Sequence, residues 1–233
     1  MLLQKVYAGL PKTVGTKDAK QPMEREWTSA IFKAPVQEAV WVGKTGLSGD
    51  GQYDQENHGG LEKAVFAYSA EHYTYWKNQH NINDISIGGM GENFVLKNMT
   101  EDEVSIGDTY QIGEAIVQVS QPRQPCWKPA RRFKTKNLAL LIQNTGRTGW
   151  YFRVLKEGRV EEGNTFSLLE RPYPQWTIQK CNEILHGREQ DFEKMKELAA
   201  CDLLAPSMRD TLQQRANKQE APNIQNRVFG PNV

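Results

Sequence analysis

The alternation of hydrophobic and polar positions changes once along the chain, near residue 172. Before it, short runs rich in β-branched and aromatic residues are separated by Gly, Pro or Asn, which is typical of strands joined by tight turns. The strands that this pattern predicts are 4–7, 27–32, 39–42, 64–68, 94–96, 103–107, 109–112, 115–120, 151–155, 159–160 and 165–169. Many short strands at this spacing predict a β-barrel or a folded-over sheet.

Two helices are expected to interrupt this β-rich part. One spans 69–79, with Ser69 as its N-cap, and the other spans 137–143. The turn residues Lys156-Glu157-Gly158 lie between two predicted strands and favour a hairpin there.

After Pro172-Tyr173-Pro174 the apolar residues recur every three or four positions, which predicts helices. Their apolar stripes fall at 178, 181, 184 and 185, then at 192, 195, 198 and 199, then at 208 and 212. Cys181 and Cys201 lie on or beside these stripes, so we expect both to pack in a core. The pattern predicts a β-domain over 1–171 and a three-helix domain over 172–217. The polar, aperiodic stretch 218–233 predicts a mobile tail.

Length and composition limit the class of protein. With 233 residues and 38% hydrophobic content the chain can bury a sizeable core. No apolar run approaches the roughly 20 residues of a membrane span, and the first seven residues are too polar for a signal-peptide core. Three widely spaced cysteines argue against a disulfide framework and favour a reducing compartment. We therefore expect a cytoplasmic location and no membrane partner.

Charge is balanced overall but not locally. The chain has 29 basic and 28 acidic residues, yet 115–156 contains no Asp or Glu. The basic residues of that stretch are Arg123, Lys128, Arg131, Arg132, Lys134, Lys136, Arg147, Arg153 and Lys156. A local cationic field in a neutral protein indicates a discrete anionic ligand rather than nucleic acid. The alternative is a solvated basic face.

Cys126 carries the strongest chemical signal. It lies in Ser-Gln-Pro-Arg-Gln-Pro-Cys-Trp-Lys-Pro, where three prolines disfavour a helix interior or a central strand. A stiff loop with one cysteine suits a thiolate aimed at a metal or a substrate. Neighbouring Arg123 and Lys128 would lower the pKa of the thiol. The alternative is a small buried hydrophobe.

A second segment, 46–65, is rich in glycine and contains His58 followed by Gly59 and Gly60. Glycines allow close backbone approach and exposed amides, the geometry of an anion-binding nest. His58 could act as an acid or base, as a metal ligand, or as a hydrogen-bond donor to phosphate. Asp50 and Asp54 could accept hydrogen bonds from a heterocycle, or could simply cap backbone amides in a turn.

A third segment, 88–94, places three glycines before Glu92 and Asn93. No Walker A loop or dinucleotide fingerprint follows it. A zinc site is unsupported because no Cys-x-x-Cys occurs, and a serine hydrolase because no Gly-x-Ser-x-Gly elbow occurs.

Five motifs in order resemble the MOSC domain family, and more narrowly its YiiM-type bacterial members. They are Lys33-Ala34-Pro35-Val36; Gly46-Leu47 with Gly49-Asp50, Gln52 and Asp54; His58-Gly59-Gly60 with Lys63-Ala64-Val65; Gly91-Glu92-Asn93-Phe94; and Gln124-Pro125-Cys126-Trp127-Lys128. The resemblance covers about 1–217. It implies a mainly β, α+β fold: a MOSC-type β-barrel followed by a small three-helix domain.

The resemblance also implies a chemistry. Members of this family bind molybdenum cofactor through a loop cysteine, here Cys126, and a soft thiolate suits such a metal. Related members reduce N-hydroxylated compounds such as 6-hydroxylaminopurine, which detoxifies modified bases. Reducing equivalents would come from a separate electron-donor reductase. A homodimer stays open.

The expected roles follow residue by residue. Cys126, as metal ligand, is expected to act with Glu92 and Asn93 in catalysis. The residues expected to hold the cofactor are Arg25, Lys33, Asp50, Gln52, Asp54, His58, Gly59, Gly60, Lys63, Gly91, Arg123 and Lys128. The main alternative is a carrier of the cofactor, or of sulfur as a Cys126 persulfide. A barrel that binds another anionic ligand is a further one.

Overall fold

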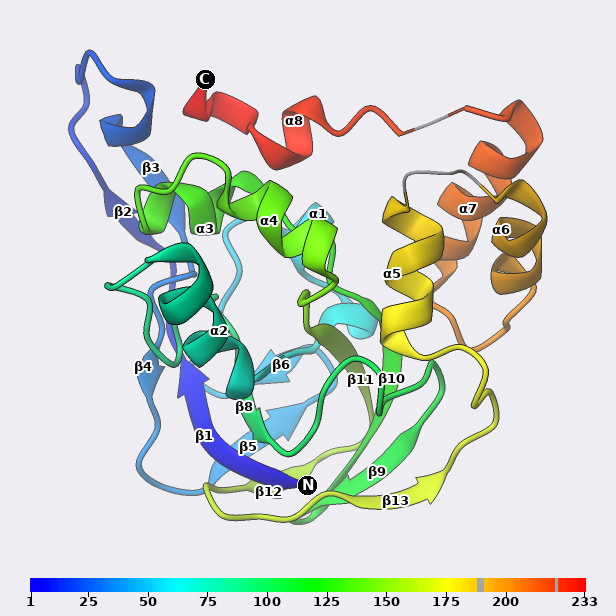
Figure 1. Cartoon of the computed structure of the whole chain (residues 1–233). Coiled ribbons are helices and arrows are strands. Elements are labelled where there is room, and N and C mark those ends of the chain that lie inside the picture. Colours follow the sequence, from blue (N-terminus) through cyan, green and yellow to red (C-terminus); the bar gives the residue numbers. More distant parts are fainter. Residues whose placement is uncertain (188–190, 221) are drawn as a thin grey trace.

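A curled eight-stranded sheet dominates the computed structural model, which describes residues 1–187, 191–220 and 222–233 (Figure 1). The strand order is β13 (Ser167–Glu170), β9 (Thr109–Ile112), β10 (Ala115–Pro122), β11 (Trp150–Lys156), β7 (Val65–Ser69), β8 (Phe94–Lys97), β1 (Leu2–Ala8) and β4 (Ala34–Pro35). All neighbours are antiparallel except β7 and β8, which are parallel.

The two ends of the sheet meet beside β1. The backbone N–H of Leu3 donates to the carbonyl of Asn164 at 2.9 Å, and Gly163 N–H donates back to the Leu3 carbonyl at 2.9 Å. These bonds satisfy backbone groups that a sheet edge would leave unpaired. The sheet therefore curls round on itself, as the barrel prediction requires.

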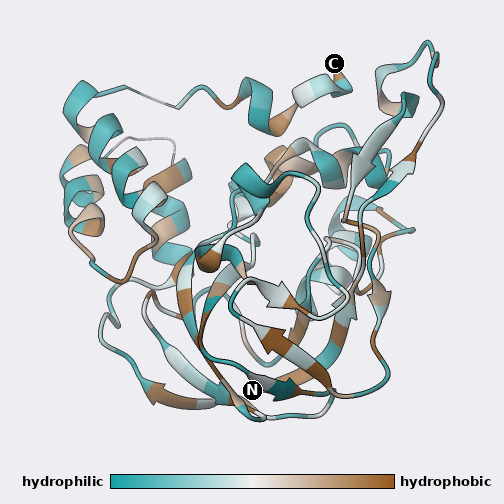
Figure 2. Ribbon diagram, turned by 180° about the vertical axis from the view of Figure 1, so that it is seen from behind, coloured by the Kyte–Doolittle hydropathy of each residue, from teal (hydrophilic) through white to brown (hydrophobic). Residues whose placement is uncertain are grey.

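Side chains alternate between two cores, one on each face of the sheet. On β7, Val65 and Ala67 belong to the core inside the curled sheet, whereas Phe66 and Tyr68 belong to a second core outside it. All five residues of β7 are buried because both faces are covered. Figure 2 shows hydrophobic stretches on the strands of the curled sheet and on the helices around it.

The outer core is covered by helices. They are α2 (Glu71–His80), α3 (Trp127–Arg132) and α4 (Leu138–Thr145). The predicted helices 69–79 and 137–143 are thereby confirmed, but the predicted N-cap is wrong. Ser69 ends β7, and its hydroxyl donates to the Glu71 carboxylate rather than capping a backbone amide.

Two smaller sheets complete the β-part. One has the order β12 (Gly158–Val160), β5 (Val40–Gly43) and β6 (Gly46–Leu47), and the other pairs β2 (Lys12–Val14) with β3 (Trp27–Ser29). The predicted hairpin around Glu157 is wrong, because β12 pairs with β5 and not with β11. The Glu157 carboxylate accepts a hydrogen bond from Lys44 N–H at 2.7 Å, which directs the chain toward β5.

The predicted strand 103–107 is also wrong. Its residues form turns, apart from an isolated bridge at Ser105. The reason is the buried Asp108 carboxylate, which accepts from the backbone N–H of Ser105 at 2.9 Å and folds the segment back.

The C-terminal helices lie to one side of the curled sheet (Figure 1). They are α5 (Ile178–His186), α6 (Phe192–Ala199) and α7 (Pro206–Lys218), and the Thr177 hydroxyl caps α5. Their buried residues belong to the same core as the inside of the curled sheet. Cys181 and Cys201 are 0% and 2% exposed, so the prediction that both pack in a core is confirmed.

The last twelve residues do not lie free as a tail. Residues 222–233 lie beside α3 and α4 and form α8 (Gln225–Val228) and a final 3-10 turn, η3 (Gly230–Asn232) (Figure 1). Val228 is fully buried, and Asn232 is 4% exposed. The expectation of a mobile tail fails because a few well-placed polar contacts, rather than a periodic apolar stripe, hold this segment. We call residues 222–233 the C-terminal strap.

Candidate active site

Cys126 stands at the start of α3, where the chain leaves β10. Only Arg123, Gln124, Pro125 and Cys126 separate the two elements. The predicted stiff loop is thus confined to these four residues, since Pro122 still belongs to β10 and Pro129 lies in α3. Cys126 is the N-cap of α3 and is partly exposed, whereas the two other cysteines are buried.

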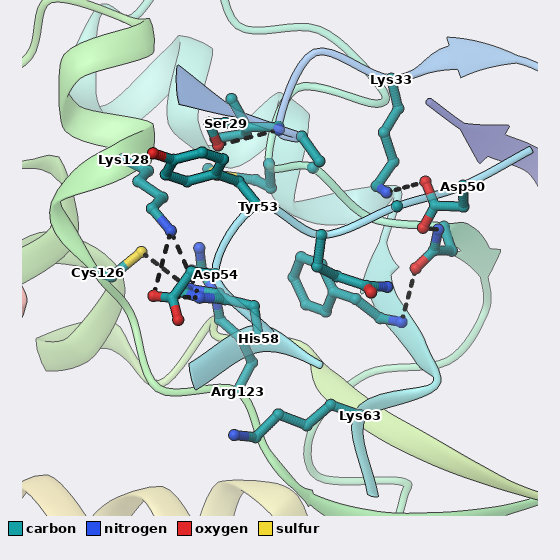
Figure 3. Close-up of a pocket in the computed structure, with 18 of the residues that line it drawn as sticks. Ser29, Lys33, Asp50, Tyr53, Asp54, His58, Lys63, Arg123, Cys126 and Lys128 are labelled. Carbon is teal, nitrogen blue, oxygen red and sulfur yellow. Dashed lines mark hydrogen bonds and ion pairs between the residues drawn. The ribbon is translucent and has the colours of Figure 1, made fainter. Parts of the chain in front are cut away.

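His58 faces the Cys126 thiol from a short helix, α1 (Gln55–His58). Its Nε2 lies 3.9 Å from Cys126 Sγ, and its Nδ1 lies 3.3 Å from the Asp54 carboxylate and 3.4 Å from Lys128 Nζ (Figure 3). Asp54 caps α1 by accepting from Asn57 N–H at 3.0 Å, which fixes the carboxylate beside the imidazole. The His58 imidazole therefore lies between the Cys126 thiol and the Asp54 carboxylate, and the Lys128 ammonium lies beside it.

These neighbours change the ionisation of Cys126. Burial opposes the charged form, but the hydrogen bond with His58 and the charges of Arg123, His58 and Lys128 outweigh it and lower the pKa of the thiol to about 6. The thiolate is thus the main form at neutral pH. The direction of this pKa shift is the one expected from Arg123 and Lys128 in the sequence. A thiolate is both a nucleophile and a soft metal ligand.

Arg123 lies in the cavity wall near Cys126 with no counter-charge bonded to it. Its side chain is 5% exposed, and its Nη1 has no hydrogen-bond partner among the described residues. The guanidinium stacks on the Phe66 ring at 5.3 Å. A buried cation without a hydrogen-bonding partner is costly, so its presence in a cavity wall indicates an anionic ligand.

The opposite wall has its polar groups fully engaged. The Asp50 carboxylate accepts from Gly9 N–H at 2.9 Å, from Asn93 Nδ2 at 2.8 Å, and from the Lys33 ammonium. The Asn93 amide also accepts from Phe66 N–H at 3.1 Å and donates to the Tyr7 carbonyl at 3.2 Å. Asp50 and Asn93 line the cavity, yet their hydrogen bonds hold this wall together and leave little capacity for a ligand.

Glu92, which the sequence suggested for catalysis, is not among the residues that line the cavity. It is fully buried and accepts from the Tyr73 hydroxyl and from the backbone N–H groups of Gly88 and Met90, at 2.9 and 3.0 Å for the amides. Burial raises the pKa of Glu92 despite these bonds. Its carboxylate therefore holds the 88–91 loop in place.

The other predicted residues divide between the cavity and its surroundings. Those that line it are Lys33, Asp50, Gln52, Asp54, His58, Lys63, Gly91, Asn93, Arg123, Cys126 and Lys128. Arg25, Gly59 and Gly60 are not among the lining residues. Arg25 is exposed and donates to the Ala19 carbonyl, and the Gly59 amide closes α1 on Gln55, so the predicted glycine nest is not at the cavity.

The basic stretch is mostly occupied elsewhere. Arg153 pairs with Glu62, Arg131 binds carbonyls of Pro22 and the C-terminal strap, and Arg147 lies over the Tyr75 ring at 3.7 Å. Only Arg123 and Lys128 of its nine basic residues line the cavity. The acid-free stretch 115–156 therefore does contribute basic residues to the cavity, but far fewer than its composition suggested.

Two connected cavities open at Cys126. The inner one encloses about 80 Å³, and the outer one about 970 Å³. Both are lined by Tyr53, Asp54, His58, Lys63, Cys126, Lys128 and Tyr151. The thiol thus faces a small recess on one side and a large chamber on the other, and we call the latter the outer chamber.

Several lining residues carried no signal in the sequence. Tyr53 and Tyr151 line both cavities, and Gln121 and Arg227 line the outer chamber. The Gln121 Oε1 is buried without a hydrogen-bond partner among the described residues, a second polar atom open to a ligand. The Asn-rich end of the chain gave no hint that Arg227 would return to the site.

Comparison with known proteins agrees with this geometry. A model of the MOSC domain matches residues 54–167, and a model of the YiiM-like three-helix domain matches residues 176–219. The uncharacterized protein YflK of Bacillus subtilis is 36% identical over 215 residues, which cover 92% of this chain and 97% of that protein. The crystal structure of YiiM from Geobacillus stearothermophilus is 36% identical, has a TM-score of 0.75, and covers 92% of this chain and 98% of that one.

A third relative is a protein of Gibberella moniliformis named "Reductase". It is 39% identical over 175 residues, which are 74% of this chain and 31% of that protein. The chain belongs to the MOSC domain family. Within it, the chain is one of the YiiM-like proteins that carry a three-helix domain after the curled sheet, so both the resemblance and the fold class predicted from the sequence are confirmed.

Two general features concern the described part of the chain. None of its helices is long and apolar enough to cross a membrane. Within the same residues, no three His, Cys, Asp or Glu side chains gather in a way that would hold a metal ion.

Proposed function

We propose that this protein is a molybdenum-cofactor-dependent reductase of N-hydroxylated compounds such as 6-hydroxylaminopurine. The observation that carries the proposal is the pairing of a low-pKa thiol, Cys126, with the hydrogen-bond-free buried cation Arg123 in one cavity wall. One is a soft ligand and the other an anion site. Membership of the MOSC family and the fungal relative named as a reductase support it.

The residues present fit a phosphorylated cofactor. The unpartnered Nη1 of Arg123 offers a donor to an anionic group, and Lys63 and Lys128 line both cavities beside it. Cys126 would ligate the molybdenum. The outer chamber, at about 970 Å³, falls within the size range of sites that enclose a small organic molecule.

The reaction consumes two electrons and two protons: the N–OH compound becomes the amine, and water is released. The bound cofactor would supply the two-electron exchange at the metal. The protein's part is to hold the substrate and to deliver protons. His58 is placed for that delivery, because its ring lies between Asp54 and the thiol and is 31% exposed.

Glu92 and Asn93, which the sequence suggested for this step, are less suitable. Their hydrogen-bonding groups are already engaged with Tyr73, the 88–91 loop, Phe66 and Asp50. The electrons would come from a separate reductase.

The test is turnover of 6-hydroxylaminopurine by cofactor-loaded protein with a chemical reductant, compared with Cys126→Ala. We expect the variant to lose both activity and bound molybdenum while its melting temperature stays close to that of the wild type, since Cys126 lies in a loop at the cavity. Wild-type protein that binds molybdenum and never turns over any N-hydroxylated substrate would contradict the proposal.

The second candidate is a carrier that holds the cofactor or passes sulfur through a Cys126 persulfide. The contact between Cys126 and His58 favours it, because a thiolate beside an imidazole is a good nucleophile. Mass spectrometry after treatment with a low-molecular-weight persulfide, which transfers its outer sulfur to the Cys126 thiolate and leaves as a thiol, distinguishes the two. A stable mass increase of one sulfur at Cys126, transferable to an acceptor, supports the carrier.

A further inference from the structure

The C-terminal strap holds the backbone on both sides of Cys126. The Arg227 guanidinium donates to the carbonyl of Pro125, the residue before it. The Asn232 amide donates to the carbonyl of Trp127, the residue after it, at 3.0 Å. Among the side chains of the described residues, only Arg227 and Asn232 donate to these two carbonyls.

The strap is itself anchored to α3 and α4. Arg131 of α3 donates through Nε to Asn232 Oδ1 at 2.7 Å and through Nη2 to the Pro231 carbonyl at 2.8 Å. Arg227 also donates to the Gln143 side chain of α4 at 2.6 Å. The anchor is therefore polar and directional, which fixes orientation more closely than apolar contact alone.

Close packing against Trp127 supports the same arrangement. Gly230 adopts φ +47°, and a Cβ at this position would come within 2.3 Å of the Trp127 ring. The Arg131 guanidinium lies 4.9 Å from the centre of that ring. Trp127, the residue that follows Cys126 and begins α3, is thus packed between Arg131 and Gly230 of the strap.

The strap also forms part of the outer chamber. Asn226 and Arg227 line it together with Ser207, Met208 and Thr211 from α7. The family models match 54–167 and 176–219, so the strap lies outside both. Without it, one side of the chamber and both carbonyl contacts around the thiol would be missing.

We propose that the C-terminal strap is part of the functional site, with Arg227 and Asn232 as positioning residues that set the orientation of the Cys126 loop. Preorganisation of this kind matters because a ligand atom displaced by about 1 Å can cost on the order of 100-fold in rate. The inference concerns the placement of the thiol and holds for a reductase and for a carrier alike; only its molybdenum test rests on the proposed function.

The test compares Asn232→Ala with Asn223→Ala in the full-length apo protein. Both are Asn-to-Ala changes in the strap, but Asn223 is exposed and, among the described residues, its amide oxygen accepts only from Gln225 N–H. Asn232→Ala removes the bonds to Trp127 and Arg131, so hydrogen–deuterium exchange of 123–130 should be at least about fivefold faster, the factor that corresponds to one lost hydrogen bond, and unchanged in Asn223→Ala. Iodoacetamide should alkylate Cys126 faster in the first variant only.

Arg227→Met provides a second route if Asn232→Ala folds poorly. We expect the same local rise in exchange over 123–130, and Arg227→Lys should restore part of the protection because it keeps one donor for the Pro125 carbonyl. Unchanged exchange over 123–130 in both variants would overturn the inference. So would an equal rise over all strands, since that reports a loss of global stability rather than of positioning.

Molybdenum content separates this inference from the proposed function. Protein produced with the cofactor available should hold less molybdenum per chain as Asn232→Ala than as wild type or Asn223→Ala. Should the wild type itself hold none, the reductase proposal fails, and the exchange measurement still decides the role of the strap.

Discussion

The two walls of the cavity differ in how their polar groups are used. On one wall, Asp50, Lys33 and Asn93 form a closed set of hydrogen bonds. On the other, Arg123 Nη1 has no partner in the described chain, and the Cys126 thiol meets only an imidazole at 3.9 Å. The first wall is built for stability, whereas the second leaves groups available at an energetic cost that a ligand can offset.

This difference shows how residues that hold the fold together can be distinguished from residues that can still bind a ligand. Asp50 and Glu92 lie in glycine-rich motifs that look like ligand loops, yet both carboxylates are consumed inside the fold. Arg123 and Cys126 lie in a proline-rich loop and retain free capacity. Four predictions test this contrast.

Lys33→Met should have the largest effect, on stability. The Lys33 and Asp50 side chains are 6% and 1% exposed, so the change leaves a buried carboxylate without its cation. Breaking a buried ion pair in this way costs about 3–5 kcal/mol, to be measured by denaturant unfolding. The control is Lys12→Met, at an exposed lysine of β2. A loss below about 1 kcal/mol would show that Asp50 is satisfied by its remaining bonds and that this wall is less constrained than its contacts indicate.

Arg123→Met should act in the opposite sense. Removing an unpartnered buried charge while keeping similar volume should leave the melting temperature unchanged or raise it. Binding of a phosphorylated pterin, followed by calorimetry, should weaken by about 1.5–3 kcal/mol, the value of a hydrogen bond to a charged group. Arg159→Met, at an exposed position of β12, is the matched control. Strong destabilisation with unchanged binding would assign Arg123 to the structural wall.

The third prediction is a pH dependence. The alkylation rate of Cys126 should rise with pH around a midpoint near 6, the pKa that its neighbours set. Because this pKa lies below the ordinary value of 9.0 for a cysteine thiol, ionisation of the thiol stabilises the fold fully above about pH 9, and this contribution is lost as pH falls through about 6.

His58→Gln should raise the alkylation midpoint by about one pH unit, since the hydrogen bond and charge of the imidazole are lost. Gln keeps a polar side chain of similar length at the end of α1. A midpoint that does not move would mean that Arg123 and Lys128 alone set the pKa and that His58 is not coupled to the thiol.

Much of this contrast could be predicted from the sequence and part of it could not. The strand pattern, the domain order and the choice of Cys126, His58, Arg123 and Lys128 as cavity residues follow from local composition and motif resemblance. Which polar residues are already satisfied does not, because Asp50 meets Gly9 and Asn93 only through long-range folding, at separations of 41 and 43 residues.

The C-terminal strap shows the same limit. Sequence patterns detect apolar periodicity, and 222–233 has none. Its attachment depends on two side chains, Arg227 and Asn232, that meet carbonyls about 100 residues earlier in the chain. The pairing of β12 with β5 escaped prediction for a similar reason, since adjacent strands in the sequence favoured a local hairpin.

Cys181→Ala should have the smallest effect, and it extends the contrast to the three cysteines. Cys181 is fully buried in the helical core, and burial raises the pKa of its thiol, the reverse of the direction at Cys126. We expect a loss of about 1 kcal/mol in unfolding free energy, typical of a small core substitution, with unchanged alkylation of Cys126 in the folded protein. Mass spectrometry of the wild type should find modification at Cys126 and not at Cys181. Comparable labelling of both would mean that the helical core opens readily, so burial there could not distinguish a packing cysteine from a reactive one.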